Sequence, residues 1–167
     1  MMIPVFVSCP TSLSDPQEES RKIIIKELHR ANLEPRALGR SDYPTELPLR
    51  EVYLIAKHCS GGIILGFEQF VVQSGTLKRN TPEEKRLAAG TTFPTPWNHL
   101  EAGILYSLGL PLLVFAEDGV SGGVFDRGVT DVYIHRMPTS RITPPARKAL
   151  SAVFQKWQAS VRSHYYR

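Results

Sequence analysis

Apolar residues along this chain fall into two alternating patterns. Short runs rich in β-branched and aliphatic residues are typical of buried strands, and stretches with apolar residues three and four positions apart are typical of helices. The predicted strands are residues 3–8, 33–38, 61–67, 111–116 and 131–135. The predicted helices are residues 16–32, 49–59, 96–108 and 144–161.

Strands that alternate with helices indicate an α/β fold. We expect a flavodoxin-like, doubly wound domain with a central, mainly parallel sheet of five strands. Local signals mark the helix ends. Asp15 is the expected N-cap of the first helix, with Glu18 completing a capping box, and Asn32 is its expected left-handed stop.

Glu101 lies in the third predicted helix, which Thr95 caps and Gly109 ends. The apolar stripe of this helix is expected to run through Trp97, Leu100, Ile104, Leu105 and Leu108, and Glu101 falls on the same stripe. A carboxylate on a core-facing stripe is costly without a partner or a function. The alternative is a slightly rotated helix that brings Glu101 to solvent.

The chain is expected to form a single domain over residues 1–167, with one long insertion at about residues 68–96. A connection of this length is unusual in a compact domain. Its charged run from Lys78 to Arg86 is expected to form a short helix. The insertion can be a solvated loop, or it can be a lid, a partner-binding surface or a self-association surface.

Composition narrows the functional classes. Hydrophobic residues make up 42% of the chain and charged residues 22%. These fractions exclude a disordered or fibrous protein. The formal net charge of +4 suits a phosphate-bearing ligand but is too small and scattered for a nucleic-acid binder. Cys9 and Cys59 form neither a disulfide framework nor a metal motif. The apolar residues 1–7 are too short for a signal peptide or membrane span, so a cytoplasmic location is expected.

Three segments around Glu101 resemble two groups of enzymes. Residues 61–66, 97–103 and 108–115 look like the nucleoside 2-deoxyribosyltransferases and the bacterial TIR-domain NAD-processing enzymes. Residues 5–8 and the polar loop around Tyr43 look more like a TIR domain. The resemblance covers most of the chain between residues 3 and 125, and its specific part is the Glu101 region.

The resemblance implies that Glu101 acts at the ribose C1′ atom when an N-glycosidic bond is cleaved. The expected activity is NAD hydrolysis or cyclisation, with NAD as a substrate and with no separate cofactor or metal. The residues expected to contact the substrate are Ser8, Cys9, Pro10, Arg40, Tyr43, Gly66 and Trp97. Arg40 and Tyr43 can bind a phosphate and a ring or be an exposed neutral pair, and Trp97 can stack on a ring or fill the core.

Two alternatives stay open. One is a nucleoside 2-deoxyribosyltransferase or nucleotide N-glycosidase, and the other is a non-catalytic nucleotide-binding or interaction module. An ion-paired Glu101 without an adjoining cleft would favour the module. The expected partners are a nucleotide or nucleoside and, by resemblance to TIR proteins of antiviral signalling, further copies of the chain, with no membrane and no nucleic acid.

Overall fold

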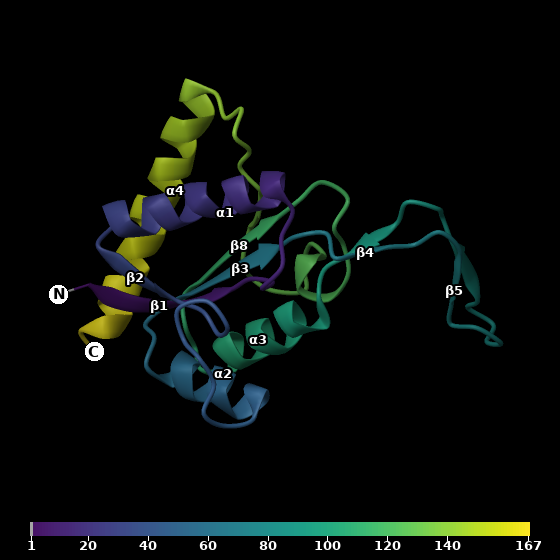
Figure 1. Ribbon diagram of the computed structural model, residues 1–167, viewed down its shortest axis with the longest axis horizontal. Coiled ribbons are helices and arrows are strands. Elements are labelled where there is room, and N and C mark those ends of the chain that lie inside the picture. Colours follow the sequence, from purple (N-terminus) through teal and green to yellow (C-terminus); the bar gives the residue numbers. More distant parts are fainter. Residues whose placement is uncertain (1) are drawn as a thin grey trace.

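A computed structural model describes residues 2–167 and contains one central sheet (Figure 1). Met1, the first residue of the apolar N-terminal run, lies outside the described residues. The sheet contains β1 (Ile3–Ser8), β2 (Leu33–Arg36), β3 (Gly62–Gly66), β8 (Leu112–Ala116) and β9 (Ile134–Arg136). Its strand order is β2-β1-β3-β8-β9, and every neighbouring pair is parallel. The predicted flavodoxin-like α/β fold is therefore confirmed.

Four helices cover the two faces of the sheet. They are α1 (Asp15–Arg30), α2 (Pro48–Lys57), α3 (Pro96–Ser107) and α4 (Pro144–Tyr165). Helices α1 and α4 lie on one face, and α2 and α3 lie on the other (Figure 1). Within residues 2–167, none of the helices is long and apolar enough to cross a membrane.

Each face of the sheet has its own apolar core, because successive strand residues point to opposite sides. Val5 and Val7 of β1 belong to the core under α1 and α4, together with Phe154 and Trp157 of α4. Phe6, between the two valines, belongs to the core under α2 and α3. Strand β1 is thus buried on both faces, as its continuous apolar run predicts.

The predicted start of α1 is wrong by one residue. The N-cap is Ser14, whose hydroxyl oxygen accepts from the Gln17 backbone N–H at 3.4 Å while the Gln17 side chain accepts from the Ser14 N–H at 3.1 Å. This capping box uses a serine and a glutamine, so Asp15 already lies in the first turn. The predicted left-handed stop at Asn32 is confirmed by its φ of 56°.

The insertion forms two antiparallel strand pairs that extend away from the sheet (Figure 1). The pair β4 (Phe70–Val71) and β7 (Thr92–Phe93) forms its base, and β5 (Gly75–Leu77) pairs with β6 (Lys85–Leu87) beyond it. The short helix predicted for residues 78–86 is absent from this part of the structure. Lys78 and Asn80 have positive φ angles of 50° and 62°. These angles reverse the chain and are incompatible with a right-handed helix.

Helix α3 presents a different face to the sheet from the one the apolar pattern predicts. Its buried residues are Asn98, Glu101, Ala102 and Leu105, whereas Trp97 is 42% exposed and Leu100 is 49% exposed. Glu101 is therefore buried next to an asparagine, and the alternative that placed it in solvent is wrong. The prediction failed for Trp97 and Leu100 because it followed the apolar residues alone, whereas the buried face also contains the amide of Asn98.

The orientation of α3 can be tested with two leucines on the same helix. Leu105→Ala removes a fully buried side chain and should cost about 2–5 kcal/mol of unfolding free energy. Leu100→Ala removes a half-exposed one and should change the unfolding free energy by about 0.5 kcal/mol or less. Urea denaturation measures both values, and equal costs would contradict the orientation.

Candidate functional site

Two local features fix the residue at which helix α3 begins. The Thr95 hydroxyl accepts a hydrogen bond from the Trp97 backbone N–H at 3.3 Å, and Pro96 takes the first helical position. Both features are typical of helix starts. From that start, one helical turn places Asn98 and Glu101 on the buried face. Both side chains then lie beside Ser8, at the carboxyl end of β1.

Asn98 joins the ends of two strands and is a site residue that the sequence did not single out. Its side chain is fully buried, and its Nδ2 donates to the Ser8 Oγ at 2.8 Å and to the Leu65 carbonyl oxygen at 3.3 Å. Ser8 ends β1 and Leu65 lies near the end of β3. An amide three residues before Glu101, and thus on the same helix face, is the signal that could have revealed it.

Glu101 carries an unusual carboxyl group. Burial raises its pKa from the ordinary 4.5 to about 7, although a hydrogen bond from Ser8 lowers it in part. Burial acts in this direction because it penalises the charged form. Within residues 2–167 the carboxyl group makes no ion pair. Because the Ser8 oxygen accepts from Asn98, its hydroxyl hydrogen is left for Glu101. A chain of hydrogen bonds therefore orients the carboxyl group.

The Glu101 side chain lies in the wall of a cleft of about 470 Å³. This volume falls in the range of small-molecule sites, and the cleft lies beyond the carboxyl ends of the strands, where such folds bind ligands. The lining comes from the loops after β1, β2 and β3, from the first residue of α2 and from the N-terminal half of α3. It consists of Cys9, Pro10, Thr11, Ser12, Leu38, Gly39, Pro44, Pro48, Gln69, Thr95, Trp97 and Glu101.

Four of the residues singled out in the sequence line this cleft together: Cys9, Pro10, Trp97 and Glu101. Ser8 lies behind them, fully buried and hydrogen-bonded to Asn98. The Trp97 ring is partly exposed in the cleft wall, where it offers an aromatic face to a ligand.

The thiol of Cys9 is not suited to nucleophilic chemistry. Burial raises its pKa to about 12, against the opposing effect of the Arg40 and Arg21 charges. The reactive form of cysteine is the thiolate, which is scarce so far below the pKa. Cys9 therefore contributes shape and a neutral surface to the cleft.

The other three predicted contact residues lie outside this lining. Arg40 lines a neighbouring cavity, and Tyr43 is 79% exposed. Gly66 is not part of the lining, and a Cβ atom there would lie 2.4 Å from Cε1 of Phe125. The close approach of the Phe125 ring thus explains why this position is a glycine.

Residues 2–167 contain no group of three or more His, Cys, Asp or Glu side chains that could hold a metal ion. The titratable group that distinguishes the cleft is the carboxyl group of Glu101.

The raised pKa of Glu101 predicts how the unfolding free energy depends on pH. Its folded-state pKa of about 7 exceeds the ordinary 4.5, so the protonated form favours the folded state. This contribution is complete below the ordinary pKa and is lost as the pH rises through the folded-state pKa. Glu101→Gln cannot ionise, so relative to wild type it should gain up to about 3 kcal/mol between about pH 4 and pH 8. Urea unfolding across this range measures the gain, and a difference independent of pH would refute it.

Comparisons of the chain with models of protein families, with curated proteins and with solved structures find no match.

Proposed function

We propose that this chain cleaves the N-glycosidic bond of a nucleotide, with NAD hydrolysis or cyclisation as its reaction. The observation that carries the proposal is the Glu101 carboxyl group, which has no ion pair within residues 2–167 and lies in a cleft wall with a pKa of about 7. An ion-paired glutamate without a cleft would have favoured a non-catalytic module. Assembly into homo-oligomers and a cytoplasmic location belong to the same proposal.

The chemistry requires one correctly placed anion. When nicotinamide or another base leaves C1′, positive charge develops on the sugar ring. An ionised Glu101 stabilises that charge electrostatically or attacks C1′ directly, and a cleft partly closed to water strengthens the interaction. The hydrogen bond from Ser8 holds the carboxylate in place. Trp97, in the same cleft wall, offers its ring to the departing base.

Replacement of the carboxyl group tests the proposal directly. Glu101→Gln keeps the size of the side chain but not its charge, and it should lower nicotinamide release from NAD by about 100-fold or more. Chromatography of the products of concentrated protein measures the release. Glu34→Gln makes the same chemical change at an exposed position on β2 and should leave the rate unchanged.

Other substrates decide between the proposal and its alternatives. Base release from deoxynucleosides but not from NAD would assign the chain to deoxyribosyl transfer or nucleoside hydrolysis. Binding of NAD without release of nicotinamide, in wild type and Glu101→Gln alike, would assign it to the non-catalytic class.

The pH dependence of the reaction reports the state of Glu101. Because the ionised form stabilises the cation, kcat/KM for NAD should rise through about pH 7 and level off above it. Ser8→Ala removes the hydrogen bond that lowers the pKa of Glu101, so the midpoint should move to higher pH. The plateau rate should fall as well, because the same bond holds the carboxylate in place. A profile that falls through about pH 7 would show instead that the protonated acid is the active form.

A further inference from the structure

A second cavity adjoins the Glu101 cleft and has a different chemical character. It measures about 460 Å³ and lies over the carboxyl ends of β1 and β2. Cys9, Thr11 and Gly39 line both spaces and form the partition between them. Gly39 has a φ of 74°, and a Cβ atom there would lie 2.9 Å from the Thr11 Cγ2. The partition is therefore thin, with the two loops in direct contact.

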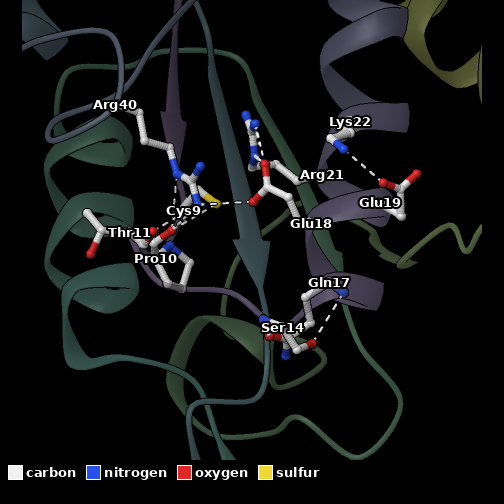
Figure 2. A network of polar contacts seen from close by, with 10 residues as sticks. All are labelled: Cys9, Pro10, Thr11, Ser14, Gln17, Glu18, Glu19, Arg21, Lys22 and Arg40. Atoms are coloured by element: carbon white, nitrogen blue, oxygen red, sulfur yellow. Dashed lines mark hydrogen bonds and ion pairs between the residues drawn. The ribbon is translucent and has the colours of Figure 1, made fainter.

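The second cavity contains two guanidinium groups, those of Arg21 on α1 and Arg40 in the loop after β2. Glu18 lies between them (Figure 2), with 2.5 Å from its Oε1 to the Arg21 Nη2 and 3.4 Å from its Oε2 to the Arg40 Nη2. One carboxylate between two cations leaves a net charge of one positive unit. It also holds the two like charges on the same side of the cavity.

Besides its contact with Glu18, Arg40 is held by hydrogen bonds to backbone carbonyl groups of the partition. Its Nε and Nη2 donate to the Pro10 carbonyl oxygen at 3.2 and 2.9 Å, and its Nη2 also donates to the Thr11 carbonyl oxygen at 3.2 Å (Figure 2). The hydrogen bonds that Arg21 and Arg40 make within residues 2–167 use Nε and Nη2. The Nη1 donors of both remain for a ligand. Arginine N–H groups match phosphate oxygens in geometry and charge.

We propose that Arg21 and Arg40 form an anion subsite that binds the phosphate groups of a nucleotide whose ribose lies against Glu101. This inference rests on the proposed function and names its substrate class. The ligand passes over the outer edge of the partition, with its sugar and base in the Glu101 cleft and its phosphates in the arginine cavity. The subsite selects nucleotides over nucleosides, because a nucleoside leaves the guanidinium groups without an anion.

The test is calorimetric binding to protein that carries Glu101→Gln, so that turnover does not interfere. The two probes are ADP-ribose, which carries a pyrophosphate, and nicotinamide riboside, which carries no phosphate. Arg21→Gln should weaken ADP-ribose binding by about 10-fold or more and leave nicotinamide riboside binding unchanged. Equal effects on both probes, or none on ADP-ribose, would overturn the subsite.

The chain offers a matched control on the same helix. Arg30 pairs with Glu27 three residues earlier, as Arg21 pairs with Glu18, but it does not line the cavity. Arg30→Gln should therefore leave ADP-ribose binding unchanged. A loss equal to that of Arg21→Gln would show that the loss comes from helix stability and would overturn the subsite.

Glu18→Gln gives a change of opposite sign. It removes the competing carboxylate from between the two guanidinium groups and should tighten ADP-ribose binding, whereas mere damage to the local fold would weaken it. An affinity that weakens as much as in Arg21→Gln would contradict an anion subsite.

Activity measurements separate this inference from the proposed function. If wild-type protein releases nicotinamide from NAD with a KM that Arg21→Gln leaves unchanged, the function stands and the subsite fails. If ADP-ribose binding depends on Arg21 but no nucleotide is cleaved, the subsite stands and the proposed reaction fails.

Discussion

The packing of α3 against the carboxyl ends of β1 and β3 is the constraint on which the site depends. Asn98 is fully buried, and its amide donates to both strand ends, so the helix cannot rotate without breaking these bonds in the interior. Glu101 lies one turn further along the same face and is buried for the same reason. The hydrogen bonds of the amide therefore fix the position of the carboxyl group and its raised pKa.

The charges of the site are divided between two neighbouring spaces. Among residues 2–167, the lining of the Glu101 cleft includes this acid but no lysine or arginine, and burial raises the pKa of Glu101 to about 7. The neighbouring cavity holds Arg21 and Arg40, whose charges are only half neutralised by Glu18. Functional sites commonly contain buried polar groups that lower the stability of the fold. Here the energetic cost is the desolvation of one carboxyl group. An anion and two cations kept apart in this way suit a ligand that is cationic at one end during reaction and anionic at the other.

The insertion is connected to the site through its base. Gln69 precedes β4 and Thr95 follows β7, and both line the Glu101 cleft. The β5 and β6 strands lie further out, and Figure 1 shows them extending away from the sheet. An isolated two-stranded ribbon of this size has little stability of its own. The geometry of the cleft rim therefore depends on the short β4 and β7 pair.

The sequence by itself determined the order of strands and helices and the parallel sheet, because these follow from local periodicity and helix-end signals. It left the burial of Glu101 open, and the packing of α3 decided it. It did not reveal Asn98, since a buried amide looks polar until its partners on β1 and β3 are known. It also placed a helix where Lys78 and Asn80 turn a hairpin, because strand pairing is a contact between distant residues. Only the tertiary structure decided that Arg40 faces Arg21 and Glu18, since α1 and the loop after β2 are separate segments that meet there.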